Sequence, residues 1–374
     1  MKRFVRSLGL AGAALALTLT AAVPAQAGGD DSGFGRAVFV QTNDPSANAI
    51  DAFHRNSDGS LTFVASYPTG GQGGRAAGSG SDPLASQGSL ALLPNAGLLL
   101  AVNAGSDSIS VFHVVGDHLH LAQVLSSGGS FPVGFAVHDR LVYVLDAGDQ
   151  GYVSGYRIAG GMLHPIQGST RALNLGNATP PFFLSSPAQA GFSPDGAHLI
   201  VTTKTNNTVD VFSIGPDGRA SAAPVQNAAA GVPFAIVFDQ SGRMVLNFAA
   251  NSSLQTFTVN ADNTITPVGA PTSDGQAAAC WITTADGFQY VSNTGSGSVS
   301  QFQVNDDGSI TLINSVAASG IAGAIDSATA GAFLYVQSGS SGTVDVFSIG
   351  AGGALTLIQV VAVPDGGSQE GIAA

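Results

Sequence analysis

Residues 193–218 read SPDGAHLIVTTKTNNTVDVFSIGPDG, and this stretch decides the fold. Its two apolar runs, His198 to Thr203 and Thr208 to Ile214, alternate or are β-branched, as expected for half-buried strands. The Asp-Gly steps at 195–196 and 217–218 predict hairpin turns, because Gly accepts the positive φ that such turns require. The stretch therefore predicts two antiparallel strands set between tight turns.

The aromatic residue of the second run recurs along the chain. It is found at Phe53, Phe112, Tyr156, Phe212, Phe257, Phe302 and Phe347, at steps of 59, 44, 56, 45, 45 and 45 residues. A base period near 45 residues is typical of a four-stranded propeller blade. Segments rich in Ala and Gly precede the first turns, as at 188–192 and 277–281, and small side chains suit strands that crowd around an axis. We therefore predict an all-β, seven-bladed β-propeller of four-stranded antiparallel blades.

The two ends of the repeat pattern complement each other. The last five residues, 370–374, resemble the inner strands but no outer strands follow them. Residues 37–40 match what other blades use as their second strand. We expect the C-terminal strand to join the first blade and close the ring, which removes exposed sheet edges. Residues 28–374 would then form a single propeller domain.

The first 27 residues have the pattern of a secretory signal peptide. Lys2, Arg3 and Arg6 precede an apolar run from about residue 8 to 23, and Ala25-Gln26-Ala27 provides small residues before the cleavage point. The apolar run is shorter than the ~20 residues that cross a bilayer. We expect a secreted protein, extracellular or periplasmic, whose mature chain begins near Gly28.

Composition narrows the choice of partners. Without residues 1–27, nine Lys and Arg residues face 24 Asp and Glu residues, a net charge of about −15. Such a chain repels phosphate backbones and anionic lipids, so neither nucleic acid nor a membrane is an expected partner. One cysteine allows no internal disulfide. We expect a monomer without a cofactor. We also expect no bound metal, because His118 and His120 lack a third ligand and the 305–308 turn lacks most calcium ligands.

The repeated Pro-Asp-Gly turns, the pattern from Val102 to Phe112 and the closing residues 371–374 point to a family. Together they resemble the lactonase-like seven-bladed propellers, typified by 6-phosphogluconolactonase and carboxymuconate cyclase. The resemblance covers essentially all of residues 28–374. It implies a small polar lactone or sugar-like ligand at the channel mouth and, for an enzyme, a lactone hydrolase.

The sequence departs from the enzymatic members of this family in two respects. It has no His pair at an inner strand, and Lys204, Arg75 and Arg171 are the few basic residues that could hold a sugar phosphate. A phosphorylated substrate is therefore not expected. The alternative to a lactonase is a non-catalytic extracellular propeller that binds a protein or a glycan on its loop face.

The two long steps of the repeat place insertions at 68–87 and at about 168–186. Both are connections between blades, so both are expected on the same face. They are either lids over the channel mouth or tolerated loop growth. The second insertion carries Phe182 and Phe183, which would mark an exposed aromatic surface in a binding module. An enzyme should instead have a deep pocket with at least two convergent ionisable groups.

Polar residues recur at the ends of the second strands on the same face. They form a ring for a hydroxyl-rich ligand or merely nucleate the following turns: Asn43, Asn103, Asp146, Lys204, Asn247, Asn293 and Gln337. A second set precedes the inner strands: Gln87, Gln189, Gln276 and Gln369. Glu370, the only glutamate, is a candidate general acid or base, or else a solvated terminal residue. Cys280 beside Trp281 is expected to be a buried core residue.

Overall fold

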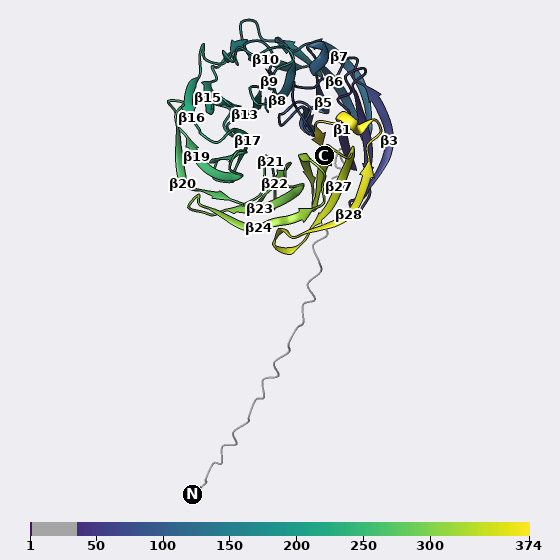
Figure 1. Cartoon of the computed structure of the whole chain (residues 1–374), viewed down its shortest axis with the longest axis vertical. Helices are drawn as coiled ribbons and strands as arrows, with labels where there is room; N and C mark the ends of the chain where they lie inside the picture. Colours follow the sequence, from purple (N-terminus) through teal and green to yellow (C-terminus); the bar gives the residue numbers. More distant parts are fainter. Residues whose placement is uncertain (2–35) are drawn as a thin grey trace. The chain divides into compact units, whose positions relative to one another are not determined.

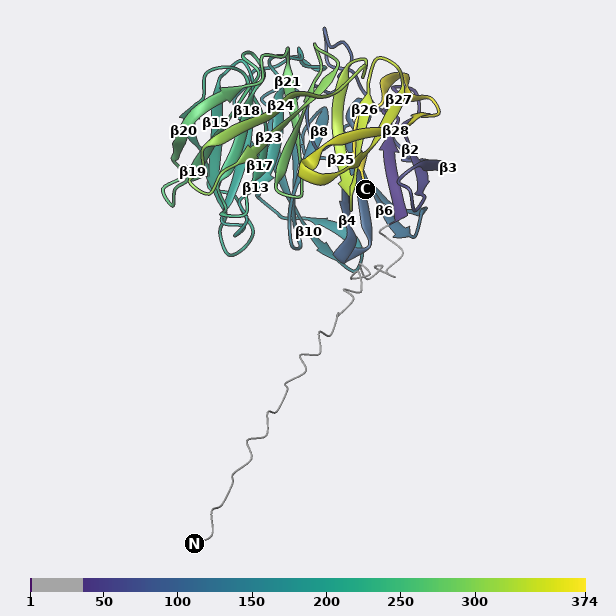
Figure 2. The same ribbon diagram turned by 90° about the horizontal axis from the view of Figure 1, so that it is seen from below.

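The computed structural model describes residue 1 and residues 36–374, so the expected signal peptide lies outside the described residues. Seven antiparallel sheets are arranged in a ring around a central channel, with the first and last strands side by side (Figure 1). The predicted seven-bladed propeller is thus confirmed. The strands of each blade run between two faces that carry the turns and loops (Figure 2).

The blades follow the chain in order, inner strand first. The first blade consists of β29 (Ile372–Ala373), β1 (Ala37–Gln41), β2 (Ala49–Arg55) and β3 (Leu61–Pro68). The second consists of β4 (Leu90–Leu93), β5 (Leu98–Asn103), β6 (Ser108–Val115) and β7 (His118–Ser126). The third consists of β8 (Pro132–His138), β9 (Leu141–Asp146), β10 (Tyr152–Ala159) and β11 (Met162–Pro165), and β12 (Arg171–Ala172) also pairs with β10.

The fourth blade consists of β13 (Pro187–Phe192), β14 (His198–Thr203), β15 (Thr208–Ser213) and β16 (Val225–Ala228), and the fifth of β17 (Pro233–Phe238), β18 (Met244–Phe248), β19 (Ser253–Val259) and β20 (Ile265–Ser273). The sixth consists of β21 (Ala279–Ala285), β22 (Phe288–Asn293), β23 (Ser298–Val304) and β24 (Ile310–Ser319). The seventh consists of β25 (Ala324–Ala330), β26 (Phe333–Ser338), β27 (Thr343–Ile349) and β28 (Leu355–Ala362).

The helical elements within residues 36–374 are short 3-10 turns: η2 (Pro94–Ala96), η3 (Ala104–Ser106), η4 (Ala351–Gly353) and η5 (Gly366–Ser368). None of these turns is long and apolar enough to cross a membrane.

The recurring aromatic residue of the sequence lies on the third strand of every blade. All seven side chains are buried between blades, with exposed fractions of 6% or less. Neighbouring inner strands contact each other around the ring, where small residues such as Ala188 and Ala279 are fully buried. The 45-residue period therefore repeats the packing of one blade on the next.

Closure of the ring also agrees with the sequence prediction. Strand β29 pairs antiparallel with β1, with Ala373 opposite Phe39 and Ile372 opposite Val40. The backbone N–H of Gln41 donates to Gly371 O at 3.0 Å, which extends the pairing. The inner edge of β1 is therefore covered by the end of the chain.

The first insertion enters the central channel. The Ser86 hydroxyl donates to Val133 O of β8 at 2.8 Å, and the N–H of Gln87 donates to Ala188 O of β13 at 2.9 Å. From the other side, the indole N–H of Trp281 on β21 donates to Ser86 O at 3.0 Å. Residues 82–87, which we call the channel plug, are thus fixed to three blades.

The two insertions pair with each other on the loop face, as expected from their positions. Ala77 N–H donates to Pro181 O at 2.8 Å, and Phe183 N–H donates to Ala77 O at 3.0 Å.

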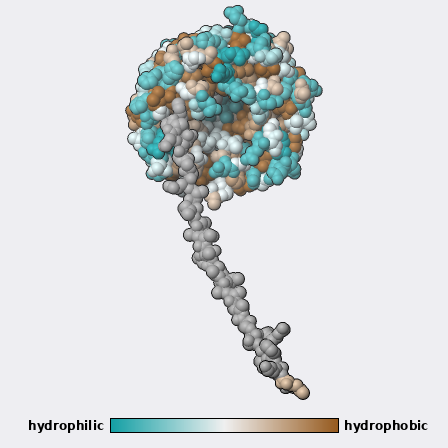
Figure 3. Space-filling model, turned by 180° about the vertical axis from the view of Figure 1, so that it is seen from behind, coloured by the Kyte–Doolittle hydropathy of each residue, from teal (hydrophilic) through white to brown (hydrophobic). Residues whose placement is uncertain are grey.

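The face of the molecule turned away from the viewer in Figure 1 mixes hydrophilic and hydrophobic residues and is hollowed near its centre (Figure 3).

Candidate active site

Three ionisable side chains from distant segments meet beside the channel plug. Asp82 belongs to the plug, Lys204 follows β14, and Glu370 precedes β29. The Ala85 N–H donates to Asp82 Oδ1 at 2.6 Å, while Ala85 O accepts a hydrogen bond from Lys204 Nζ. The Leu84 N–H donates to Glu370 Oε2 at 3.2 Å. The plug backbone therefore positions all three groups.

The plug adopts an unusual backbone conformation at this point. Ala85 has a φ of 56°, in the left-handed region that a residue with a Cβ rarely adopts. Such a conformation costs about 1–3 kcal/mol and persists only where surrounding contacts impose it. The bonds from Ala85 to Asp82 and Lys204, together with the full burial of Leu84, supply these contacts.

The carboxyl groups of Asp82 and Glu370 are hydrogen-bonded to each other and bind a proton more tightly than isolated carboxyls do. Burial raises the pKa of Glu370 well above its usual range, and the charge of Asp82 raises it further. Burial also raises the pKa of Asp82, opposed by the hydrogen bond from Glu370 and by the charge of Lys204. Two carboxylates cannot hydrogen-bond without a proton, so the pair shares one, and Glu370 is the protonated member.

Lys204 is the only lysine after Lys2, and it is almost fully buried. Burial lowers its pKa to about 8, against the opposing charge of Asp82. Its ammonium lies 5.3 Å from the centre of the Phe234 ring. An ammonium group has three donors and Ala85 O takes one of them, so Lys204 can also donate to a ligand oxygen.

A cavity of about 410 Å³ opens against these groups. Asp82 and Lys204 line it, together with Phe183 and Leu184 of the second insertion and inner-strand residues such as Trp281. Asp82 is partly exposed, whereas Glu370 is fully buried and lies behind Asp82, outside the lining. A ligand in this cavity would therefore touch Asp82 and Lys204 and not Glu370.

Two further ionisable groups belong to this region: Cys280 lines the cavity, and Asp326 is close enough to Asp82 to feel its charge. Burial raises the pKa of Asp326 to about 7 and that of the Cys280 thiol to about 12. A thiol with such a pKa is protonated at neutral pH and is a poor nucleophile. Cys280 is thus a buried side chain of the inner-strand layer, as expected from the sequence.

The predicted polar ring does not line the cavity, apart from Lys204. Its asparagines are fully buried and bind neighbouring segments of the ring. Asn43 exchanges two hydrogen bonds with Gly74, and Asn247 links Ala235 N–H to Ala279 O. Asn103 bonds Ser110 and Asn293 bonds Ser300. These contacts give the asparagines a role between strands and blades, and contact with a ligand stays a prediction.

The predicted glutamines likewise bind protein groups. Gln87 of the plug exchanges two hydrogen bonds with the backbone of Ile282, and Gln189 accepts from Ile236 N–H at 2.6 Å. Gln276 accepts from the Ser298 hydroxyl at 3.3 Å. Gln369 donates to Ser338 O and Thr343 O and adjoins Gln337. None of these glutamines is among the residues that line the cavity.

Asp146 is buried at the end of β9, and no described residue donates a well-formed hydrogen bond to either of its carboxyl oxygens. Its neighbour Ser127 instead donates to the carbonyl groups of Asp107 and Gly129. Burial raises the pKa of Asp146 to about 8. The carboxyl group is therefore largely protonated at neutral pH.

This burial predicts a pH-dependent effect on stability. Because the folded state holds the Asp146 proton up to about pH 8, while the unfolded state releases it near pH 4, stability falls between these values. Asp146→Asn is expected to raise Tm by several degrees at pH 8 and to leave it unchanged at pH 4. The exposed Asp286→Asn variant is the matched control in calorimetric scans. An equal Tm of wild type and Asp146→Asn at pH 8 would contradict the prediction.

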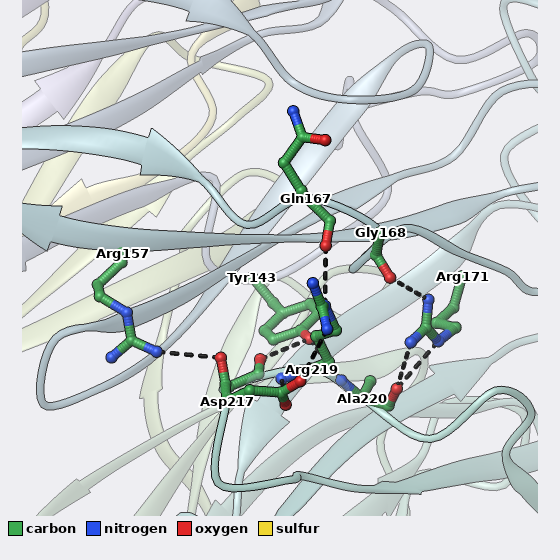
Figure 4. Close-up of polar contacts among 9 residues, drawn as sticks. Tyr143, Arg157, Gln167, Gly168, Arg171, Asp217, Arg219 and Ala220 are labelled. Atoms are coloured by element: carbon green, nitrogen blue, oxygen red, sulfur yellow. Dashed lines mark hydrogen bonds and ion pairs between the residues drawn. The ribbon is translucent and has the colours of Figure 1, made fainter.

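A larger cavity of about 1140 Å³ lies between the turns of the second, third and fourth blades. Its charged residues Asp139 and Arg140 are exposed, where solvent screens their charges. Arg157 donates to Asp217 O and Arg219 to Gln167 O, which ties the third blade to the fourth (Figure 4).

Arg171, one of the basic candidates for a sugar phosphate, belongs to the same network. Its guanidinium donates to the carbonyl groups of Gly168 and Ala220 (Figure 4). It also donates to the carbonyl groups of Thr170 and Ser221. Arg75 donates to Gly80 O at 2.7 Å and is exposed. Within residues 36–374, no group of three His, Cys, Asp or Glu side chains is placed to hold a metal.

Asp82 is the functional candidate that sequence reasoning missed. One signal could have found it, since Asp82 is the only acidic residue of the 68–87 insertion. The convergence of Asp82 with Lys204 and Glu370 could not be read from local pattern. These groups meet only because the insertion folds into the channel.

The fold is a seven-bladed propeller, and its candidate site is a cavity at the channel that Asp82 and Lys204 line. The model of the family "Lactonase, 7-bladed beta-propeller" matches residues 253–368, which confirms the resemblance that the sequence predicted. Asp82, Lys204 and Glu370 lie outside the matched residues. The match therefore supports the fold and does not identify the site.

Solved structures extend the similarity over most of the chain. A protein from Lactobacillus plantarum is 21% identical, with a TM-score of 0.71, and covers 89% of this chain and 98% of its own. A periplasmic gluconolactonase from Pseudomonas aeruginosa is 18% identical, with a TM-score of 0.70, and covers 90% and 98%. No curated protein matches the chain significantly.

A lyase also has a related fold. Virginiamycin B lyase from Staphylococcus aureus is 12% identical, with a TM-score of 0.51, and covers 74% of this chain and 84% of its own. At these identities the comparisons show the fold, and one fold carries several activities. The activity therefore depends on the residues of the site.

Proposed function

We propose that this protein is an exported lactone hydrolase whose reaction takes place in the 410 Å³ cavity. The observation that carries the proposal is the meeting of Asp82 and Lys204 at the cavity wall, with Glu370 hydrogen-bonded behind Asp82. This arrangement meets the criterion of a pocket with at least two convergent ionisable groups. The basic and apolar pattern of residues 1–27 supports export.

In the proposed mechanism Asp82 acts as general base. It takes a proton from a water molecule that attacks the lactone carbonyl carbon. Lys204 donates to the carbonyl oxygen and stabilises the negative charge that develops there. When the tetrahedral intermediate collapses, the ring C–O bond breaks and the leaving alkoxide receives the proton held by Asp82. The product is an open-chain hydroxy acid.

Glu370 is a positioning residue in this scheme. Its proton lies in the hydrogen bond to Asp82, where it holds the Asp82 carboxylate in place. The Leu84 N–H orients Glu370 in turn. Direct contact of Glu370 with substrate is not part of the proposal, because the side chain does not line the cavity.

The experiment that tests the proposal is hydrolysis of a panel of unphosphorylated lactones by the protein from residue 28 onward, followed by pH-stat. Turnover above the spontaneous rate that vanishes in the Asp82→Asn variant would support it. A rate equal to the blank for every lactone would refute it, and would favour the glycan- or protein-binding alternative. The exposed side chain of Phe182 on the second insertion would then be the first residue to test for contact with a glycan or protein ligand.

The pH profile of the reaction follows from the same groups. Lys204 stabilises the oxyanion only when protonated, so kcat/KM is expected to fall as pH rises through about 8. Asp82 acts as a base only when ionised, so kcat/KM is expected to fall on the acid side at a higher pH than an ordinary aspartate would give. Rates between pH 5 and 9.5, corrected for spontaneous hydrolysis, measure both limbs. A profile that is flat above pH 7 would exclude the role of Lys204.

A further inference from the structure

The cavity that holds Asp82 and Lys204 has an apolar lining. Apart from these two side chains, only Ser81 and Thr294 contribute polar side-chain oxygens. The rest of the wall is formed by backbone, small residues and large apolar side chains: Gly80, Ala85, Phe183, Leu184, Val232, Phe234, Ala249, Ala250, Ala278, Cys280 and Trp281. A ligand would therefore meet hydrocarbon on most of its surface.

The few polar groups of the lining already have partners. The Ser81 hydroxyl bonds the Ser340 hydroxyl at 2.6 Å, and the Thr294 hydroxyl donates to Ala324 O at 2.9 Å. Lys204 and Asp82 are both bound to Ala85. A sugar lactone would bring several hydroxyl groups into this cavity, and most would lose water without gaining a partner.

We infer that the substrate is a lactone with an apolar alkyl or aryl substituent, and not a hydroxyl-rich sugar lactone. This inference rests on the proposed hydrolysis and specifies its substrate class. The ester group would face Asp82 and Lys204, while the substituent packs among Phe183, Phe234 and Trp281. The Phe234 and Trp281 rings meet edge to face, 5.1 Å between centroids, and form one continuous apolar wall.

The size of the cavity agrees with such a ligand. A volume of about 410 Å³ lies toward the lower end of the range for small-molecule sites, roughly 300–1,000 Å³. It accommodates a lactone ring with a substituent of moderate length. Burial of each additional methylene group is expected to tighten binding roughly fourfold until the cavity is full.

The chain itself contains a probe for this test. Trp281 is the only tryptophan and lines the cavity, so its fluorescence reports on ligands bound there. We would titrate the Asp82→Asn variant, to prevent turnover, with γ-butyrolactone, γ-hexalactone, γ-octalactone and glucono-δ-lactone. Calorimetry on the same solutions detects any binding that leaves the fluorescence unchanged. The dissociation constant is expected to fall along the alkyl series, with glucono-δ-lactone the weakest ligand.

A matched pair of variants checks the location. Phe183→Ala removes part of the apolar wall and is expected to weaken γ-octalactone binding about tenfold, with little effect on γ-butyrolactone. Phe182→Ala is the control, because Phe182 is 49% exposed and does not line the cavity. Equal effects of the two substitutions would contradict the placement of the substituent.

The outcomes separate this inference from the proposed function. Chain-length-dependent binding without turnover of any lactone would refute hydrolysis and retain the apolar ligand class. Turnover confined to sugar lactones would retain hydrolysis and overturn the inference. A constant affinity along the alkyl series, or no binding by either method, would also overturn it.

Discussion

Replacement of Asp82 by Asn is expected to lower kcat for lactone hydrolysis by about 10²–10⁴-fold, the usual contribution of a general base. The amide of the Asp82→Asn variant can still accept the Ala85 N–H through Oδ1 and can donate to Glu370, so the fold should be retained. The substitution also removes one member of a buried carboxyl pair, so Tm is expected to stay the same or rise. Steady-state kinetics and calorimetry on the same preparation measure both effects.

Two further variants test whether the loss of kcat is specific to the Asp82 carboxylate. The exposed Asp306→Asn variant changes the net charge equally and should keep wild-type kcat. Glu370→Gln keeps a donor behind Asp82 but removes the shared proton, so the acid limb of the pH profile should move to lower pH with a smaller loss of kcat. If Glu370→Gln abolished turnover and Asp82→Asn did not, the two carboxyl groups would have the opposite roles.

Truncation after Asp365 is expected to lower Tm by about 10 °C or more. The deletion removes β29, whose Ile372 is 5% exposed and packs with Val38 and Val40 of β1. Loss of one buried Ile side chain alone costs about 2–5 kcal/mol, and each kcal/mol shifts Tm by roughly 2–4 °C in domains of 150–250 residues. The truncated chain also exposes the inner edge of β1, which favours aggregation.

The control for this truncation is deletion of Ala374 alone, which leaves the pairing of Ile372 and Ala373 with β1 intact. Differential scanning calorimetry and size-exclusion chromatography would compare the three proteins. If the chain that ends at Asp365 melted with the full-length chain and remained monodisperse, β29 would not be needed to hold the ring together.

The sequence predicted the fold because its signals are local and repeated. Strand alternation and Asp-Gly turns act over a few residues, and the aromatic period places Phe53, Phe212 and the other copies between blades. Closure was equally predictable, since an inner strand at the end of the chain complements a first blade that lacks one. Each of these features could be recognised without knowing which blades touch.

The candidate site was predictable only in part. Lys204 and Glu370 were candidates from their positions beside strands, and the structure brings both to the plug, where they bind Ala85 and Leu84. Sequence reasoning did not reveal that Glu370 lies behind another carboxyl group. It also did not reveal that Asn43, Asn247 and the other ring asparagines use their amides to join neighbouring segments.

By itself, then, the sequence determined the seven-bladed ring, its closing strand and the face on which both insertions lie. Only the tertiary structure decided that residues 82–87 enter the channel, that Asp82 meets Lys204 and Glu370, and that apolar side chains surround them. The physical reason is the separation along the chain of the residues that interact. Turns and strand periodicity arise from neighbouring residues, whereas Leu84 and Glu370 are 286 residues apart, and their contact depends on every blade between them.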